Sequence, residues 1–468
     1  MEKEKGHQFW GGIHPTDGYD KLLTAEKEIR EYVPQRVTIV MEQTPGALCE
    51  PLVKKGDHVR AGDLVGKPVS FLAVPLHASI SGTVTDVREV LHAGRQTMAC
   101  IIERDGQHKG PERAKSQEGV QRVSVKKKGR QGEGEEKLEA SHFTREELLG
   151  KMKEMGLVGM GGAGFPTYIK YSTEKEIDSL LINGAECEPF LTCDYRLMLE
   201  DTYGLLNGIR VLKQACHASQ VYICLEDNKQ MAAEVLENVL AQQQEENIRV
   251  HLLPTRYPQG GERQLVQAVL GREIKAGGLP ADAGAVISNV ATAKAAADAV
   301  YEEWPLTSRI VTVSGDVKDP GNYRVPVGTS LKELLERSGG ALSPQNQVIL
   351  GGPMTGTCIA HNWTQDELGY VTKTTAGILV FKEESIKETP CIRCQACVNV
   401  CPAGLWPYQI DFAYLEENYG LCEALYASEC IACGCCSYVC PAKRELTFRI
   451  RKARDLVKKS RREKEKRG

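Results

Sequence analysis

Eight cysteines in two runs are the residues whose types and spacing most clearly predict chemistry in this chain. The first run, CIRCQACVNVCP, begins at Cys391, and the second, CIACGCCSYVCP, begins at Cys430. Each run follows a pattern in which three close thiolates hold one 4Fe–4S cluster and the fourth binds the other cluster. That rule predicts two ligand sets, which are Cys391, Cys394, Cys397 and Cys440 for one cluster and Cys401, Cys430, Cys433 and Cys436 for the other.

Zinc is the alternative metal, because soft thiolates bind it as well. Zinc sites usually present two ligand pairs separated by a longer loop, whereas these two equal runs are each closed by proline, which favours iron–sulfur clusters. Cys435 is surplus to the pattern, since its neighbour Cys436 fits the spacing better. The stretch between the runs is predicted to be helical, with Cys422 in its core rather than on a metal.

A second candidate site is the glycine-dense stretch GLVGMGGAGFPTYIK, residues 156–170. Small residues let backbone N–H groups approach an anion, and a helix beginning near Pro166 would turn its positive end toward a phosphate. The stretch is neither a Walker A loop nor a dinucleotide-binding fingerprint placed directly after a clear strand. A tight structural turn is therefore the alternative interpretation.

The elements that must position these residues divide the chain into several domains. Its 468 residues, 41% hydrophobic and 26% charged, are typical of a globular protein with three or four domains. Short β-branched runs between glycine and proline turns in residues 37–103 predict a compact barrel or sandwich. A capping box at Thr144 and Glu147 then starts alternating helices and strands, as in a layered α/β domain. The last pattern before the cysteine runs is a strand, a turn, a second strand and a helix. This order predicts a small β-grasp domain.

We therefore predict an α/β multidomain fold. Its parts are a β barrel-sandwich domain (1–104), a polar linker or insertion (105–140), an α/β domain (141–305), a β-grasp domain (306–380), an α-helical two-cluster domain (381–448) and a basic tail (449–468). The first domain resembles the biotinyl/lipoyl carrier fold. Its short central link offers only Lys67, off the expected hairpin tip, which favours a structural module over a swinging arm.

Charge and cysteine usage exclude several classes of protein. A net charge of −3 gives no bulk attraction to nucleic acid. We expect no signal peptide and no membrane span, because the chain lacks the apolar runs that both require. Seventeen cysteines without an export signal indicate a reducing compartment and metal ligation. The basic tail is either a solvated helix end or a docking segment for anionic lipid or an acidic partner.

The glycine stretch resembles the Gly-x-Gly-Gly-Ala-Gly-Phe-Pro-Thr loop of the NADH-oxidising flavin subunit of respiratory complex I. The segments NGAECEPFLTCDYRLM, YPQGGERQL and SNVAT match that family in the same order, but Ala185, Gly261 and Ala291 stand where it has carboxylates. The resemblance implies an FMN and NADH pocket. The cofactor-binding residues it implies are Gly159, Gly161, Gly162, Gly164, Phe165, Lys170, Asn183, Glu186, Glu188, Gly260, Glu262, Asn289 and Thr292.

The order of domains and the opening GGIHP at residues 11–15 resemble the RnfC family of Rnf electron transport complexes. The resemblance implies a peripheral subunit on the cytoplasmic side of the cell membrane, in an ion-translocating ferredoxin:NAD+ oxidoreductase. Its cofactors would be FMN, NAD(H) and two 4Fe–4S clusters, with an SLBB-type β-grasp domain and a ferredoxin-like cluster domain. Its partners would be the integral membrane and iron–sulfur subunits of the complex, with ferredoxin reached indirectly.

Hydride passes directly between nicotinamide and flavin, so we expect no catalytic residue beyond the cofactor pocket. Two alternatives use the same parts. A soluble flavin and iron–sulfur corrinoid reductase would share the flavin loop and the clusters without membrane partners. A non-enzymatic assembly scaffold would keep the β-grasp domain and an empty flavin pocket, as the lost carboxylates at Ala185 and Ala291 would allow.

Overall fold

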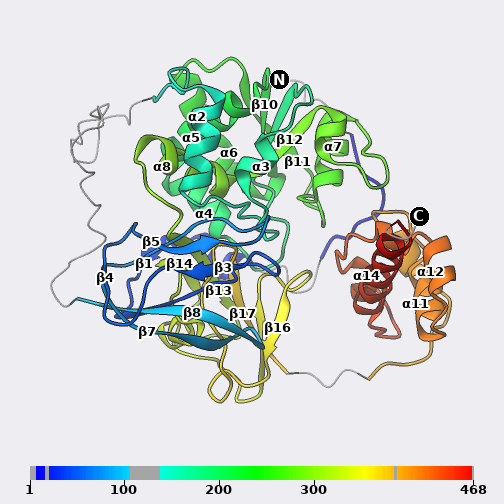
Figure 1. Cartoon of the computed structure of the whole chain (residues 1–468). Coiled ribbons are helices and arrows are strands. Elements are labelled where there is room, and N and C mark those ends of the chain that lie inside the picture. Colours follow the sequence, from blue (N-terminus) through cyan, green and yellow to red (C-terminus); the bar gives the residue numbers. More distant parts are fainter. Residues whose placement is uncertain (1–6, 16–20, 106–136, 384–386, 466–468) are drawn as a thin grey trace.

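The computed structural model describes residues 7–15, 21–105, 137–383 and 387–465. Apart from its ends, the predicted insertion at 105–140 lies outside the described residues. Figure 1 shows the barrel-sandwich in blue beside the β-grasp sheet in yellow, with the α/β domain in green above both. The C-terminal helical module, in orange and red, lies to one side. The predicted fold class is confirmed.

The barrel-sandwich domain consists of small antiparallel sheets with the orders β2-β8-β7-β4 and β3-β5-β6. Val37, Ile39, Val84 and Ile102 are buried between the sheets, as alternation along the strands predicts. Lys67 lies exposed on β5. The strands are β2 (Arg36–Val40), β3 (Cys49–Pro51), β4 (His58–Val59), β5 (Leu64–Pro68), β6 (Leu76–His77), β7 (Gly82–His92) and β8 (Arg95–Arg104).

His77 on β6 makes the stability of this domain depend on pH. The side chain is buried, and its Nδ1 has no hydrogen-bond partner among the described residues. Burial, with a smaller effect of Lys373, lowers the pKa of His77 to about 3. Below pH 6.5 the unfolded chain therefore binds a proton that the folded domain does not, and stability falls as the pH falls.

We expect His77 by itself to lower the free energy of unfolding by about 2 kcal/mol between pH 7.5 and pH 5, since one pKa unit is worth about 1.4 kcal/mol. His77→Leu should lack this contribution, so its change in stability between the two pH values should differ from that of the wild type by about 2 kcal/mol, measured by urea unfolding of the full chain. Substitution of the exposed His142 is the control. Equal pH dependence in the wild type and His77→Leu would contradict the assignment.

The β-grasp domain contains a mixed sheet with the order β1-β14-β13-β17-β15-β16. Its edge strand β1 comes from the N-terminal region and pairs in parallel with β14, Ile29 opposite Asn322. β1 therefore belongs to the β-grasp sheet and not to the barrel, although it precedes the barrel in the sequence. The elements are α1 (Leu22–Ala25), β1 (Ile29–Glu31), β13 (Ser308–Gly315), β14 (Gly321–Pro326), α9 (Leu331–Arg337), β15 (Asn346–Leu350), β16 (Thr357–Ala360) and β17 (Gly377–Lys382).

The α/β domain is built on a parallel sheet with the order β11-β10-β9-β12. Leu180 and Ile182 of β9 pack against α2, α5, α6 and α8, whereas Leu181 faces the opposite side and α7. The predicted capping box at Thr144 and Glu147 is present at the start of α2. The helices are α2 (Arg145–Glu154), α3 (Thr167–Tyr171), α4 (Cys193–Glu200), α5 (Thr202–Cys216), α6 (Gln230–Gln242), α7 (Glu262–Leu270) and α8 (Val290–Tyr301). The strands are β9 (Ser179–Asn183), β10 (Gln220–Glu226), β11 (Ile248–Leu253) and β12 (Ala285–Asn289).

The C-terminal module is helical, as predicted, and Cys422 is buried in its core. Its last helix, α14, contains most of the predicted basic tail. Ile450, Ala453 and Val457 on α14 are buried, so this part of the tail is a core helix with one solvated face. The helices are α10 (Ala396–Asn399), α11 (Pro407–Leu415), α12 (Tyr419–Ala424), α13 (Cys435–Tyr438) and α14 (Leu446–Glu465).

Candidate redox sites

The candidate flavin residues gather at the carboxyl ends of β9 and β12. The chain runs outward from β9 to β10 and β11 and then returns to place β12 on the other side of β9. Open α/β sheets bind ligands in the crevice at such a reversal of strand order. Asn183 ends β9 and Asn289 ends β12, and the two lie opposite each other in register. The topology therefore brings two predicted residues, far apart in the sequence, to one edge.

The glycine loop closes over this edge as a tight turn. Met160 N donates to Thr292 Oγ1 at 2.8 Å, which fixes the loop to the start of α8. At the tip, Gly162 has a φ of +112°, and a Cβ added there would meet nothing within 4 Å. The tip thus offers bare backbone beside open space, as a bound flavin would require. The predicted helix is the five-residue α3, too short to supply a strong terminal dipole, so the loop amides are the main donors.

The base of the glycine loop is fixed by contacts with other domains. Lys373 of the β-grasp domain donates to Gly156 O at 2.7 Å and to Pro75 O of the barrel at 2.9 Å. Burial lowers the pKa of Lys373 to about 7. A Cβ on Gly164 would lie 2.2 Å from Thr44 Cγ2, so the barrel packs directly against this glycine.

Other predicted pocket residues line the same edge. Asn183 Nδ2 donates to Gly260 O at 2.9 Å, which joins the loops after β9 and β11. Lys170 Nζ donates to Glu262 Oε1 at 2.6 Å and to Ile287 O at 2.9 Å. Amide groups, a lysine and a carboxylate around open backbone can bind phosphate, ribose hydroxyls and the polar edge of a flavin ring. Phe165, at the end of the glycine loop, is 38% exposed.

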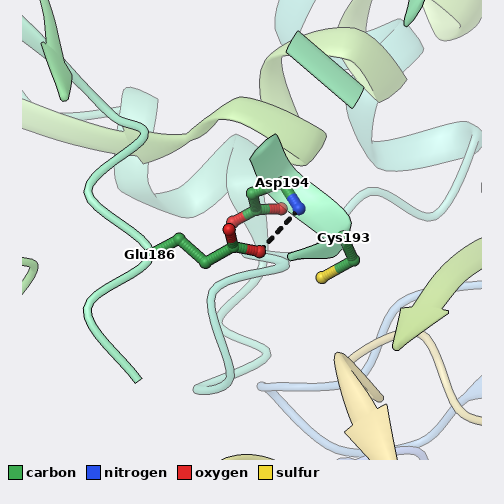
Figure 2. A group of neighbouring side chains, drawn as sticks. All are labelled: Glu186, Cys193 and Asp194. Atoms are coloured by element: carbon green, nitrogen blue, oxygen red, sulfur yellow. Dashed lines mark hydrogen bonds between the residues drawn. The ribbon is translucent and has the colours of Figure 1, made fainter. Parts of the chain in front are cut away.

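Glu186 and Glu188 are at the same edge, but their carboxylates already have protein partners. Glu186 accepts a hydrogen bond from Asp194 N at 2.8 Å, at the start of α4 (Figure 2). It also accepts a hydrogen bond from Tyr195 N at 3.3 Å. Burial raises the pKa of Glu186 to about 7, against the opposing effect of Lys21. Glu188 accepts from Met354 N and Thr355 N at 3.0 Å each, so it holds a turn of the β-grasp domain.

Ligand atoms of Glu186, Cys193 and Asp194 lie within 4.8 Å of one another (Figure 2). The two carboxylates are engaged, however. Glu186 binds backbone N–H groups of α4, and Asp194 Oδ2 accepts from Asn289 Nδ2 at 2.6 Å. We therefore interpret this cluster as a brace between the loop after β9 and the start of α8, not as a metal site.

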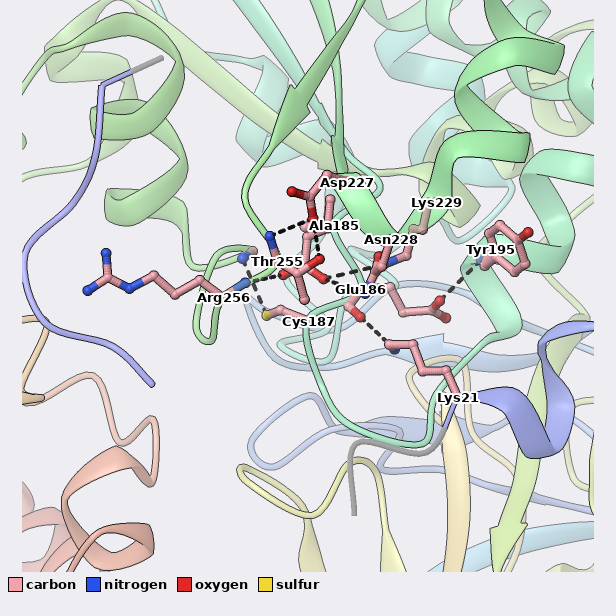
Figure 3. A network of polar contacts seen from close by, with 12 residues as sticks. Lys21, Ala185, Glu186, Cys187, Tyr195, Asp227, Asn228, Lys229, Thr255 and Arg256 are labelled. Atoms are coloured by element: carbon pink, nitrogen blue, oxygen red, sulfur yellow. Dashed lines mark hydrogen bonds and ion pairs between the residues drawn. The ribbon is translucent and has the colours of Figure 1, made fainter. Parts of the chain in front are cut away.

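Lys21 is a site residue that sequence reasoning missed. Its Nζ donates to Glu186 O at 2.8 Å, to Glu188 O at 2.9 Å and to Leu191 O, and it thus holds the whole loop after β9 (Figure 3). Burial lowers the pKa of Lys21. Because these acceptors are backbone carbonyls in a distant part of the sequence, no pattern of side chains could have indicated them.

The eight cysteines line two separate cavities in the C-terminal module. The cysteines of one cavity are Cys391, Cys394, Cys397 and Cys440. Those of the other are Cys401, Cys430, Cys433, Cys435 and Cys436. The structure thus brings together the members of each predicted crossed set, with Cys435 added to the second.

The spacing of the sulfur atoms suits a cluster better than a single ion. In tetrahedral zinc sites, with Zn–S bonds of about 2.3 Å, the sulfurs lie about 3.8 Å apart. Across the described residues, the group at Glu186 is the one place where three possible ligand atoms lie within 4.8 Å of one another, and no three cysteines do. The cavities therefore fit 4Fe–4S clusters, whose thiolates stand further apart around four irons.

The second cavity adjoins the candidate flavin pocket. Tyr257, in the loop after β11, donates its hydroxyl to Cys433 O at 2.7 Å. Tyr257 also packs in an apolar cluster with Ile13 and Cys435, against Cys187 of the loop after β9. Cys435 therefore lies on the contact between the two domains. Sequence reasoning missed this contact because each of the two segments fits its own motif, and neither motif points to a partner in the other domain.

Four family models match successive parts of the chain. They are the RnfC barrel sandwich hybrid domain (7–107), the Nuo51 FMN-binding domain (152–298), the SLBB domain (310–357) and the 4Fe-4S dicluster domain (383–457). The chain therefore has domains of the FMN-binding and two-cluster types. In the described residues, no helix combines the length and the apolar character needed to cross a bilayer.

Two curated proteins, both the C component of a ferredoxin:NAD(+) oxidoreductase complex, are similar over most of their length. The one from the Na(+)-translocating complex of Acetobacterium woodii is 39% identical, covering 95% of this chain and 96% of that protein. The one from the proton-translocating complex of Clostridium ljungdahlii is 36% identical, covering 88% and 85%. A chain of the NAD+-reducing [NiFe]-hydrogenase structure has a TM-score of 0.46 and 21% identity, covering 67% of this chain and 61% of its own.

Proposed function

We propose, given that this chain belongs to the RnfC family of Rnf ferredoxin:NAD+ oxidoreductase complexes, that it exchanges electrons between NAD(H) and such a complex. FMN and two 4Fe–4S clusters carry them. The observation that carries the proposal is the contact of Tyr257 with Cys433, which joins the flavin edge of the sheet to one cysteine cavity. Family membership favours this function over a soluble corrinoid reductase.

The flavin would lie at the edge formed by β9, β12 and the glycine loop. Backbone N–H groups at residues 161–163 and the amides of Asn183 and Asn289 would hold its phosphate and ring edge. The ion pair of Lys170 and Glu262 would form the third side of the flavin pocket. Bound FMN exchanges a hydride with NAD(H) as an electron pair and passes single electrons to the clusters.

The cluster held by Cys401, Cys430, Cys433 and Cys436, here called the proximal cluster, would exchange electrons with the flavin. The cluster held by Cys391, Cys394, Cys397 and Cys440, here called the distal cluster, would exchange them with partners. Two contacts support this order. Gly434 of the second cysteine run lies against Met354. The backbone N–H of Met354 in turn donates to the carboxylate of Glu188 in the flavin domain. Cys394 is by contrast exposed, so a partner can approach the distal cluster.

The setting of the chain is part of the same proposal. We place it on the cytoplasmic side of the membrane, as a peripheral subunit bound to integral membrane and iron–sulfur subunits. The curated relatives are by name subunits of ion-translocating complexes, which supports such partners. Electrons would reach ferredoxin through those subunits and not from this chain directly.

The decisive experiment is anaerobic reconstitution of the full chain with FMN, iron and sulfide, followed by titration with NADH. Visible spectra report the flavin and EPR spectra report each cluster. We expect bound FMN, two 4Fe–4S clusters and reduction of both cofactor types by NADH. A scaffold would pass no electrons from NADH to the clusters, whether or not its flavin pocket is filled. Uptake of zinc in place of the clusters would contradict the proposal.

Gly162→Val tests the position of the flavin. The protein leaves open space at this glycine, so a valine would meet the flavin and little else. We expect FMN affinity to fall at least about tenfold, equal to about 1.4 kcal/mol, when measured by fluorescence titration. Gly56→Val is the matched control, because Gly56 also has a positive φ, +94°, and open space. Unchanged FMN binding in Gly162→Val would place the flavin elsewhere.

A further inference from the structure

An N-terminal strap, residues 9–14, lies between the α/β domain and the C-terminal module (Figure 1). On the module side, Gly12 N donates to Val400 O at 2.8 Å. Gly11 has a φ of +73°, and a Cβ there would lie 2.8 Å from the backbone carbon and oxygen of Cys401. The strap therefore touches the backbone of a proximal-cluster ligand so closely that a side chain has no room.

On its other side the strap is bound to the loop after β11. Ile13 and Tyr257 exchange two backbone hydrogen bonds, of 2.8 and 2.9 Å. The guanidinium of Arg256 stacks 4.8 Å from the Phe9 ring centroid and donates to Phe9 O and Gly11 O. These contacts combine a short backbone pairing with a cation held over an aromatic face, which gives the strap a fixed path.

The strap and Tyr257 together reach both halves of the proximal ligand set. Gly11 abuts Cys401 from the first cysteine run, and the Tyr257 hydroxyl binds Cys433 O from the second. The loop that carries Tyr257 also carries Gly260, which binds Asn183 at the flavin edge. One continuous set of contacts thus runs from the flavin edge to the proximal cavity, with the strap filling its middle.

We propose that the strap is a positioning element for electron transfer, which fixes the proximal cavity at a set distance from the flavin edge. The inference rests on the proposed function. Electron transfer between cofactors slows steeply with their separation, so a loosened contact costs rate without loss of either cofactor.

Gly11→Ala in the fully reconstituted chain tests the proposal. We expect wild-type flavin reduction by NADH in stopped-flow spectra, but severalfold slower appearance of the reduced proximal-cluster EPR signal. Gly277→Ala is the matched control, because Gly277 has a φ of +74° with nothing within 4 Å of an added Cβ. The control should keep both rates.

Arg256→Met is a second variant that adds no bulk and removes the donors to the strap carbonyls. It should slow the cluster signal alone, and Arg256→Lys, which keeps a cation, should recover part of the rate. Wild-type cluster rates in both Gly11→Ala and Arg256→Met would overturn the proposal, and so would equal slowing of flavin and cluster reduction. The rates of flavin and cluster reduction can also be measured with a photochemical electron source in place of NADH. Failure of NADH to reduce the wild type would therefore count against the proposed function alone.

Discussion

Replacing Cys401 with alanine is expected to leave reduction of the flavin by NADH intact but to stop most electron flow beyond it. In the crossed arrangement Cys401 lines the proximal cavity with Cys430, Cys433 and Cys436. Loss of that cluster removes the step between the flavin edge and the distal cavity. We expect reduction of the remaining cluster to become far slower than in the wild type, since electrons would have to cross the whole distance from the flavin to the distal cavity without an intermediate cofactor.

Cys397→Ala is the paired variant. Cys397 stands a few positions earlier in the same run but lines the distal cavity. Its loss should remove the distal cluster and leave the proximal cluster reduced at the wild-type rate. EPR spectra and iron content of the two reconstituted proteins measure the difference. If both variants lost the same cluster, the ligand sets would be uncrossed and the proposed order of electron transfer would be wrong.

Asp411→Ala is expected to destabilise the C-terminal module by about 3–5 kcal/mol, as removal of one partner from a buried ion pair does. Asp411 on α11 is fully buried and accepts from Arg444 Nε at 2.8 Å and Arg449 NH1 at 3.2 Å. Glu388 is the other acidic partner that both arginines share, and Arg449 also approaches the exposed Glu445 at 3.9 Å. Removal of Asp411 would leave two largely buried guanidinium groups with Glu388 as their one shared carboxylate.

Urea unfolding of the reconstituted chain, followed through the cluster absorbance, measures this loss. Asp455→Ala is the control, because Asp455 pairs with Arg454 on the same module but its side chain is 57% exposed. Exposed pairs contribute about 0–1 kcal/mol, so the control should stay close to the wild type. Equal stability of Asp411→Ala and the control would show that the buried network contributes little.

The fold and the cysteine sets could be predicted because their signals are local. Ligand spacing within each run, the capping box at Thr144 and alternation along strands each depend on a few neighbouring residues. The glycine loop was also recognisable, since few sequences place so many glycines before Phe165 and Pro166. The resemblance named both Asn183 and Asn289, and the structure shows them opposite each other where the parallel strands β9 and β12 end.

What the sequence did not reveal are contacts between distant backbones. Lys21 acts on carbonyl groups, which every residue has, so its targets leave no trace in side-chain patterns. Glu186 and Glu188 match a cofactor-binding motif, yet in the structure their carboxylates bind backbone N–H groups of α4 and the β-grasp turn. Charge dominates the composition of the basic tail and makes it look solvated, although a spaced apolar stripe packs one face of its helix against the module.

The first segments of the chain to leave the ribosome are among the last to find their partners. β1 cannot pair until Asn322 of β14 has been synthesised, and Gly12 of the strap cannot bond until Val400 has been synthesised. Such sequence separation slows final assembly and keeps the nascent chain open. The pairing of β1 and the docking of the strap therefore form only after the matching segments, far along the chain, have been synthesised.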